Sequence, residues 1–203
     1  MDILIHHGDV SGFRTSALHL LGHQVHPAAV AWSGTAPLAG LAGEGRGPGS
    51  VTRVAASVVP RSFLRITDLA LLHSDPQRFD LLYRLLWRIV HEPRLKDDKG
   101  DYDMQRVQRM ASAVRRELQG LKSSVAFVPV AYEGGTLSCG WADPQFYVAE
   151  AFALWVARSQ PGADFLVATP QRCILSHGRV IHHLPAIPVA PGNADEWLRV
   201  LVH

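Results

Sequence analysis

The sequence predicts an α+β fold, on three observations. Apolar residues at helical spacing run through the middle of the chain, from about residue 61 to residue 120. Alternating, β-branched segments with glycine turns follow, between residues 124 and 183. The two kinds of element come in blocks and not in strict alternation, which is typical of α+β folds. We therefore expect a helical N-terminal and middle part packed on a small, mostly antiparallel sheet formed largely by residues 124–183.

The chain begins with a short predicted strand at residues 2–5, followed by a helix. Asp9 or Ser11 can cap that helix, which runs to about Leu21 and ends at Gly22. A cap at its start and a glycine at its end are two independent signals, so they predict one complete helix here.

Residues 25–32 predict a turn and a second short strand, and residues 33–58 are rich in glycine and proline. This stretch holds no GxxxxGK[ST] pattern, so we predict a flexible loop and not a phosphate-binding loop. With 203 residues the chain is long enough to bury one sizeable core. We expect a single domain over residues 1–203.

Residues 74–95, SDPQRFDLLYRLLWRIVHEPRL, carry the clearest local signal in the chain and follow a predicted helix at 61–72. Ser74 or Asp75 can cap a helix, Pro76 suits its first position and Pro93 ends the run. One apolar stripe lies at helical spacing: Phe79, Leu82, Leu86, Ile89 and Val90. Three cations lie away from the centre of that stripe: Arg78, Arg84 and Arg88.

A long helix is predicted next, at about residues 103–120, with Gly120 at its end. Its expected buried stripe consists of Met104, Val107, Ala111, Val114, Leu118 and Leu121. Arg106, Arg109 and Arg116 share another face, within about 80° at 100° per residue. The helix therefore has one apolar face and one cationic face.

The spacing then changes from helical to alternating. The predicted strands are Ser124–Tyr132, Thr136–Trp141, Asp164–Thr169, Cys173–Ser176 and 179–183. Gly134 and Gly135 suit the turn of a hairpin between the first two. A helix is expected at about 145–158, after Pro144.

Composition excludes several classes of protein. No apolar run approaches the roughly 20 residues that cross a bilayer. The start, MDILIHHGD, lacks the pattern of a secretory signal, so we expect a cytoplasmic protein without membrane contact. Net charge is +2, but residues 61–122 hold 13 Lys and Arg against 9 Asp and Glu. That mild basic bias permits contact with nucleic acid.

Candidate catalytic and metal-binding groups are sparse. His19 and His23 can share a helix face, but a metal site needs further ligands and we expect none. Cys139 and Cys173 form no CxxC pair, so we predict two buried thiols. No GxSxG motif is present, and the carboxylates at 97–103 lie in an exposed connection. We expect no cofactor.

Arginines are the remaining signal, because the planar guanidinium makes two parallel bonds to phosphate. The candidate nucleic-acid-binding residues are Arg84, Arg88, Arg106, Arg109, Arg116 and Lys122. The alternative is a solvated face in which the arginines pair with Asp80, Asp101 or Asp103. Asp80 and Arg84 have the i,i+4 spacing of a local pair. The sequence leaves both interpretations open.

Residues 59–95 resemble the signature of a bacterial family of "probable DNA metabolism proteins", a domain of unknown function. The similarity extends to DVSGFRTSALHLL near the start, to MASAVRREL, to Trp141–Pro144, and to Thr169, Pro170 and Gly178. In that family the domain is found fused to X-type uracil-DNA glycosylase-like domains, or encoded beside a radical-SAM DNA repair protein. The resemblance thus implies DNA and one of these proteins as partners.

The chain also departs from the family pattern. Where relatives carry His-Lys-Met-Lys, residues 119–122 read Gln-Gly-Leu-Lys, and where relatives often have two histidines stand Phe146 and Tyr147. A His-Trp-Asp cluster of relatives corresponds to residues 175–177, Leu-Ser-His, and the chain stops at His203 without a basic, aromatic tail. The resemblance therefore implies a divergent, C-terminally short member.

Three functions follow as hypotheses. The first is an accessory protein of DNA repair or modification that binds nucleic acid or docks a catalytic partner through its Arg-bearing helices. The second is an enzyme acting on a nucleobase or nucleotide, with a pocket that would draw on Trp87, Trp141, Tyr147, Arg172 and His177. The third is a protein-interaction module without nucleic-acid contact. Whether the protein is an enzyme stays open.

Overall fold

The computed structural model describes residues 1–35, 61–92, 94, 95, 98, 100–178 and 180–202. The described residues form two compact units, the first up to Arg115 and the second from Arg116 onward. The boundary falls inside one continuous helix, so the single domain expected from the sequence stays a prediction. From residue 36 on, the predicted loop at 33–58 lies outside the described residues.

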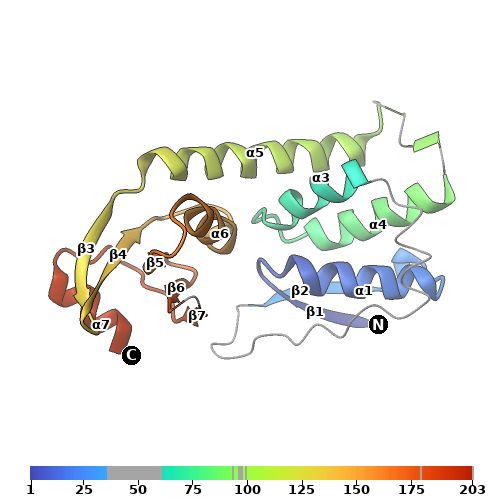
Figure 1. Cartoon of the computed structure of the whole chain (residues 1–203). Coiled ribbons are helices and arrows are strands. Elements are labelled where there is room, and N and C mark those ends of the chain that lie inside the picture. The colour runs from blue at the N-terminus through green and yellow to red at the C-terminus, as the bar shows by residue number, and fades with distance from the viewer. Residues whose placement is uncertain (36–60, 93, 96–97, 99, 179, 203) are drawn as a thin grey trace. The chain divides into compact units, whose positions relative to one another are not determined.

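The first unit combines a two-stranded parallel sheet with helices (Figure 1). Its elements are β1 (Asp2–His6), α1 (Val10–Gly22), η1 (Pro27–Ala29), β2 (Ala31–Thr35), α3 (Arg61–Leu71), α4 (Arg78–His91) and the start of α5 (Tyr102–Ser124). Asp9 caps α1 as predicted, since its carboxylate accepts a bond from the amide of Gly12 at 2.7 Å. α1 connects the two parallel strands, which places the C-terminal ends of β1 and β2 at the same edge.

Aromatic rings fill the core of the first unit. Phe13 of α1 lies 4.9 Å from the ring of Trp32 on β2 and 5.7 Å from Phe79 on α4. The hydroxyl of Tyr83 donates to the carbonyl of Val25 at 2.6 Å, and burial raises the pKa of Tyr83 to about 12. These contacts join α1, β2 and α4 through the apolar stripe that the sequence predicts for α4.

α4 begins two residues later than expected. Pro76 lies in the turn before the helix and not at its first position, and Gln77 is the N-cap. Asp75 stabilises that turn, because its carboxylate accepts a bond from the amide of Gln77 at 2.9 Å. The cation of Arg78, assigned from its spacing to the polar side, is instead fully buried.

α5 is longer than the sequence indicates. It runs from Tyr102 to Ser124 and passes through Gly120, which was expected to end it. Met104, Val107, Ala111 and Val114 are buried, as the predicted stripe requires. A single glycine in a helix costs only about 1 kcal/mol, and apolar contacts of Leu118 and Leu121 on both sides of Gly120 outweigh that cost.

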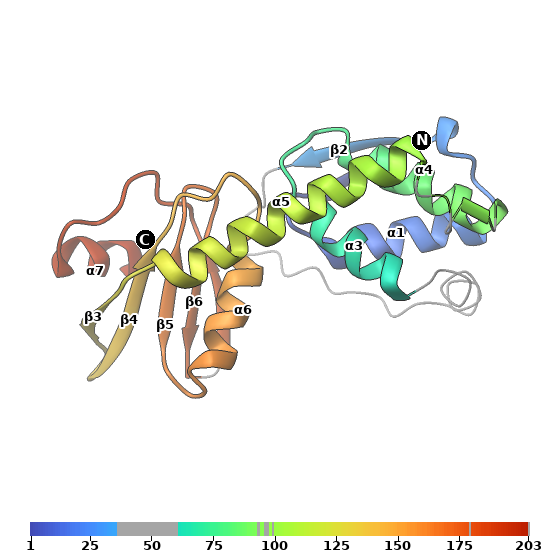
Figure 2. The same cartoon turned by 90° about the horizontal axis from the view of Figure 1, so that it is seen from above.

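The second unit is built on a five-stranded sheet, whose strands are drawn side by side in Figure 2. Its strands are β3 (Phe127–Tyr132), β4 (Gly135–Trp141), β5 (Phe165–Ala168), β6 (Cys173–His177) and β7 (Val180–Leu184), in the order β3-β4-β5-β6-β7. β4 and β5 are parallel and connected through α6 (Ala149–Ser159), and every other neighbouring pair is antiparallel. The predicted α+β class with a mostly antiparallel sheet is therefore confirmed.

The hairpin between β3 and β4 turns one residue earlier than predicted. Tyr132 pairs with Gly135, so the two turn residues are Glu133 and Gly134. Both have positive φ, 47° and 77°, which is the geometry of a type I′ turn. Such turns match the twist of the two strands, and the register that pairs Val130 with Leu137 places the turn at Glu133 and Gly134.

Alternate residues of the strands face two different helices. Leu166 and Cys173 share one face of the sheet with Trp197 of α7 (Ala194–Val202), while Val167 and Ile174 share the other face with α6. α7 was missed from the sequence, although Trp197 is buried against the sheet. In the described part of the chain no helix is both long and apolar enough to span a membrane.

Candidate nucleic-acid interface

The two predicted cations of α4 are held in ion pairs with the start of α5. Arg84 makes a two-bonded contact to the carboxylate of Asp103, at 2.9 and 2.8 Å. Arg88 bonds Asp101 at 2.8 Å and lies 3.5 Å from Asp103. The local Asp80–Arg84 pair was a wrong prediction: Arg84 turns to Asp103 because α5 brings that carboxylate opposite the helix.

These ion pairs also shift the pKa values of Asp101 and Arg84. Burial opposes the ionisation of Asp101, but bonds from Arg88 and from the amide of Met104 outweigh it and hold the pKa of Asp101 below its usual range. The hydrogen bond to Asp103 raises the pKa of Arg84. The carboxylate of Asp101 thus stays charged and holds Arg88 in place. Both arginines mainly connect α4 to α5.

Arg106 is likewise engaged. Its guanidinium lies 2.6 Å from the carboxylate of Asp75 in the turn before α4 and 3.2 Å from the side-chain oxygen of Gln77. Despite opposing burial, bonds from Arg106 and from the amide of Gln77 lower the pKa of Asp75. Three of the six predicted nucleic-acid-binding cations therefore have internal carboxylate partners.

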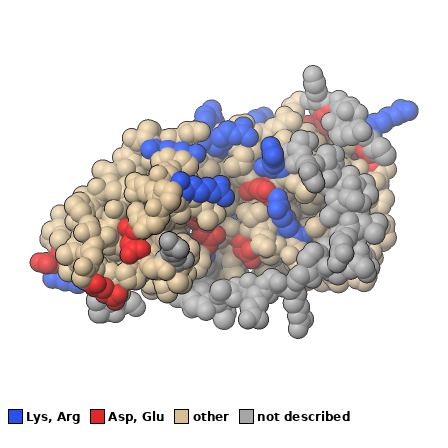
Figure 3. Space-filling view, viewed as in Figure 1, with Lys and Arg blue, Asp and Glu red and all other residues tan. Residues whose placement is uncertain are grey.

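The outward face of α5 carries arginines that are exposed to solvent. Arg109 and Arg116 are exposed and lie seven residues apart, which places them within about 20° of each other on the helix. Arg115, which we did not single out from the sequence, is exposed beside them. Among the described residues no carboxylate lies within ion-pair distance of these three. Figure 3 shows Lys and Arg side chains gathered where Figure 1 draws α5.

Acidic residues are absent from this stretch of the helix. From Met104 to Arg116 the sequence contains four arginines and no Asp or Glu. The next acid, Glu117, is occupied, because its carboxylate accepts bonds from the amides of Gln145 at 2.7 Å and Phe146 at 3.0 Å. The arginines on the outward face of α5 are thus left without an ion-pair partner among the described residues.

Lys122 has an aromatic partner. Its ammonium lies 5.5 Å from the ring centroid of Trp155 on α6, close enough for a cation–π interaction. Lys122 therefore flanks the arginines on the same helix, while its charge also lies over an indole.

The five residues suggested as a pocket are placed in separate parts of the chain. Trp87 belongs to the first unit, where its ring stacks on His91 at 4.1 Å. In the second unit, Trp141 and Arg172 lie at the end of the sheet where Ala168 pairs with Cys173. Tyr147 lies in the turn before α6, and His177 lies at the opposite end of β6. The structure brings together Trp141 and Arg172 at one sheet end, and places His177 at the other.

Arg172 and His177 each belong to a charged cluster of their own. The guanidinium of Arg172 bonds Glu150 in the first turn of α6, and His183 lies 3.6 Å from the same carboxylate. His177 lies between two carboxylates, 2.8 Å from Asp164 at Nδ1 and 3.1 Å from Glu133 at Nε2. Because these contacts use opposite edges of the ring, the two carboxylates and the imidazole cannot converge on one metal ion.

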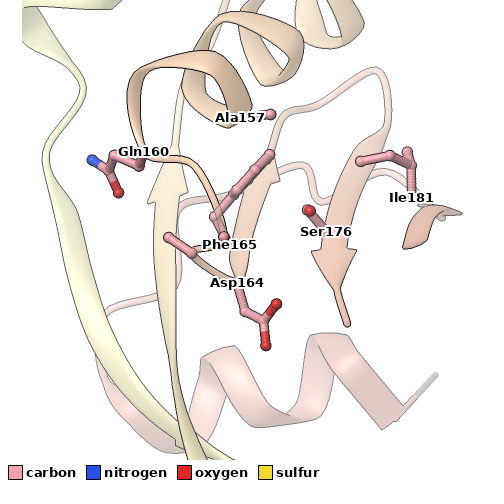
Figure 4. A pocket seen from close by; sticks show the side chains of 8 residues that line it. Ala157, Gln160, Asp164, Phe165, Ser176 and Ile181 are labelled. Carbon is pink, nitrogen blue, oxygen red and sulfur yellow. The ribbon is translucent and has the colours of Figure 1, made fainter. Parts of the chain in front are cut away.

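A small pocket lies beside the second cluster (Figure 4). Its volume is about 220 Å³, and its lining includes Ala157, Asp164, Phe165 and the nearly buried Ser176. Figure 4 shows the ring of Phe165 directed toward Ala157 and the carboxylate of Asp164 directed away from it. None of the five residues suggested as a pocket lines this cavity, which is smaller than most ligand sites.

The two thiols are buried, as predicted, and both are free. Burial raises the pKa of Cys139 to about 12, so this thiol stays protonated and is a poor nucleophile. Within the described ranges no three His, Cys, Asp or Glu side chains meet as a metal site.

The buried Arg78 forms a cluster that sequence analysis missed. Its Nε donates to the carbonyl of Leu71 at 2.9 Å, and one terminal nitrogen donates to the carbonyl of Asp75 at 3.0 Å. The other lies 2.7 Å from Nδ1 of His7, directly after β1. Arginine can only donate, so Nδ1 of His7 is the acceptor and must be unprotonated. Arg78 directly follows the N-cap of an amphipathic helix, and nothing in the sequence around it indicates that its side chain is buried.

We predict that this His7–Arg78 contact makes folding sensitive to acid. Burial first, and then Arg78 and His6, lower the pKa of His7, so the folded protein keeps this ring neutral below pH 6.5 while the unfolded chain binds a proton. Stability should therefore fall as pH drops from about 7 to about 5.5. Urea unfolding across that range measures it.

His7→Asn supplies the control for this prediction. Its amide oxygen offers an acceptor near the position of Nδ1 but does not titrate, so the pH dependence should become shallower. Because burial and Arg172 also lower the pKa of His183, and burial chiefly lowers that of His73, part of the slope should remain. An unchanged slope in His7→Asn would contradict the assignment.

One comparison identifies a family. The model of a domain of unknown function, DUF4130, matches residues 76–185, which include α4, α5 and the whole five-stranded sheet. No curated protein and no solved structure matches the chain. The match covers 110 of the 203 residues and contains the arginines on the outward face of α5. The chain therefore belongs to the DUF4130 family, a domain of unknown function.

Proposed function

We propose that the protein is a nucleic-acid-associated accessory protein of DNA repair or modification, and that it contacts phosphates through the outward face of α5. The observation that carries this proposal is the group of three exposed arginines, Arg109, Arg115 and Arg116, without a carboxylate partner among the described residues. We leave Arg84, Arg88 and Arg106 out of this proposal, because each of them has a carboxylate partner within the protein.

Helix geometry supports phosphate contact by these side chains. Arg109 and Arg116 are seven residues apart, which is about 10.5 Å along the helix axis. That distance is about three times the 3.4 Å rise between base pairs, so the two guanidinium groups can reach different phosphates of one backbone. The neighbouring Glu117 forms no ion pair with them, since its carboxylate binds two backbone amides.

A salt series tests the proposal. Fluorescence anisotropy with labelled single- and double-stranded DNA should give a binding constant whose logarithm falls linearly with the logarithm of salt concentration. The double variant Arg109→Ala/Arg116→Ala removes two phosphate contacts, so the slope should become shallower by about 1.4 to 1.8. Affinity at low salt should drop on both kinds of DNA.

The matched control removes the same charge elsewhere. Arg158 on α6 and Arg199 on α7 are both exposed, so Arg158→Ala/Arg199→Ala lowers the net charge equally. This control should keep the wild-type slope on double-stranded DNA. Equal losses of double-stranded DNA binding in the two double variants, or binding that does not respond to salt, would refute a specific role of α5. Undetectable binding would favour a protein-interaction module.

The repair or modification context rests on the family resemblance. Relatives fused to uracil-DNA glycosylase-like domains or encoded beside radical-SAM proteins support a catalytic partner of one of these two kinds. Gel filtration of the purified chain with such a protein from the same host should show co-elution. Separate elution at micromolar concentrations of both would count against a stable complex.

A further inference from the structure

Trp155 is an aromatic side chain with two different neighbours. It lies on α6, half-buried, and Phe152 stacks beneath it with the ring planes at 16° and the centroids 5.8 Å apart. On α5, the ammonium of Lys122 lies over the Trp155 ring, 5.5 Å from its centroid. The indole is thus held in a fixed orientation by a buried ring and covered by the end of a flexible side chain.

The surroundings of Trp155 are cationic. Arg158 follows three residues later on the same helix and is exposed. The acid of α6, Glu150, lies in its first turn and bonds Arg172. Lysine carries its charge on a flexible four-carbon stem, so the ammonium of Lys122 can leave the ring and follow a phosphate. Leaving the ring would uncover an aromatic surface between two cations.

Proteins that bind single-stranded nucleic acids use this combination. A base stacks on an aromatic side chain, while nearby cations follow the backbone. In a duplex the bases already stack on one another, so an aromatic side chain of this kind has no base to contact. An indole with Lys122 over its face and Arg158 one helical turn away can therefore distinguish single strands from duplexes, which the arginines of α5 cannot do.

We propose that an unpaired base stacks on Trp155 while Lys122 moves from the ring to the adjacent phosphate, so that the protein prefers single-stranded nucleic acid. This inference rests on the proposed function, because the arginines of α5 supply the phosphate contacts. It adds the class of substrate, which those contacts alone do not specify.

Oligonucleotides without bases provide the most direct experiment, because they leave the protein unchanged. An oligo-dT strand and an abasic strand of equal length carry equal charge, and only the former can stack. The oligo-dT strand should bind roughly tenfold more tightly than the abasic strand, as expected for one stacked base. Oligo-dT and oligo-rU should bind alike, since both offer a base and a phosphate.

Variants of Trp155 then locate the effect. Trp155→Leu keeps an apolar side chain but cannot stack, so affinity for oligo-dT should fall roughly tenfold while affinity for duplex changes less than about twofold. Trp155→Phe should retain part of the affinity. Addition of oligo-dT should quench tryptophan emission in the wild type, and Trp155→Phe should remove most of that quenching. Trp87→Phe, a half-buried tryptophan of the other unit, should keep it.

The outcomes separate the two proposals. If abasic and oligo-dT strands bind equally and Trp155→Phe quenches like the wild type, stacking on Trp155 is refuted while phosphate binding by α5 stands. If Arg109→Ala/Arg116→Ala leaves binding to every strand unchanged, the proposed function fails instead. Should Trp155→Leu not fold, the abasic strand and the quenching of Trp155→Phe still decide the matter.

Discussion

Replacing Arg78 by leucine should lower the free energy of unfolding by about 3 kcal/mol or more. The guanidinium is fully buried and donates to the carbonyls of Leu71 and Asp75 and to Nδ1 of His7. Leucine removes all of these donors, so the carbonyl of Leu71 and Nδ1 of His7 lose a charged hydrogen-bond donor inside the unit. Urea unfolding followed by circular dichroism measures the loss.

The same substitution at Arg84 is the control. Arg84 lies on the same helix with 47% of its side chain exposed, and Arg88 remains beside Asp103 when Arg84 is replaced. Exposed ion pairs contribute about 0–1 kcal/mol, so Arg84→Leu should cost less than about 1 kcal/mol. Arg78→Lys should fall between the two, because one ammonium cannot reach acceptors on three sides. Similar values for Arg78→Leu and Arg84→Leu would show that burial of the guanidinium contributes little.

Glu117→Ala should destabilise the protein by about 1–3 kcal/mol, because it removes two charge-assisted hydrogen bonds. The carboxylate of Glu117 joins the end of α5 to the turn before α6, through the amides of Gln145 and Phe146. Without it, the amide of the partly buried Phe146 loses its acceptor. Thermal and urea unfolding of the variant measure the change.

Two further variants make this prediction specific. Glu117→Gln keeps one acceptor oxygen and should lose only part of the stability. Gln119→Ala lies two residues further along the same helix on its exposed surface, and should change stability by less than about 0.5 kcal/mol. Glu117→Ala also removes the acid nearest to the arginines of α5, so DNA affinity at low salt should rise. A destabilisation equal to that of Gln119→Ala would contradict the bonding role.

Much of the fold could be predicted from the sequence, because local patterns determine it. Asp9 caps α1 as expected, and the apolar stripe of α4 packs into the core at Phe79 and Leu82. The strands of the second unit lie within a few residues of their predicted positions. In each case the signal is a spacing of apolar residues or a capping side chain, and both act over a few residues.

Other features depend on contacts between distant residues. α7 has a local start signal that we missed, because the side-chain oxygen of Asn193 accepts a bond from the amide of Glu196 at 3.0 Å, but its place on the sheet depends on the burial of Trp197. Arg78 is buried because α3 and the loop after β1 bring acceptors to it from residues 7 and 71. Arg84 pairs with Asp103 across helices instead of with Asp80 along its own. No local pattern specifies these partners.

For the candidate site, the sequence by itself determined which cations α5 carries and that Arg109 and Arg116 share one face, because a helix fixes that relation at 100° per residue. Only the tertiary structure decided which cations have carboxylate partners, since the partners come from other elements. In the folded chain Arg106 pairs with Asp75, whereas Arg109 and Arg116 are exposed. Lys122 lies over the ring of Trp155. Whether an arginine is paired or exposed depends on carboxylates that are distant in the sequence, and only folding brings those carboxylates to it.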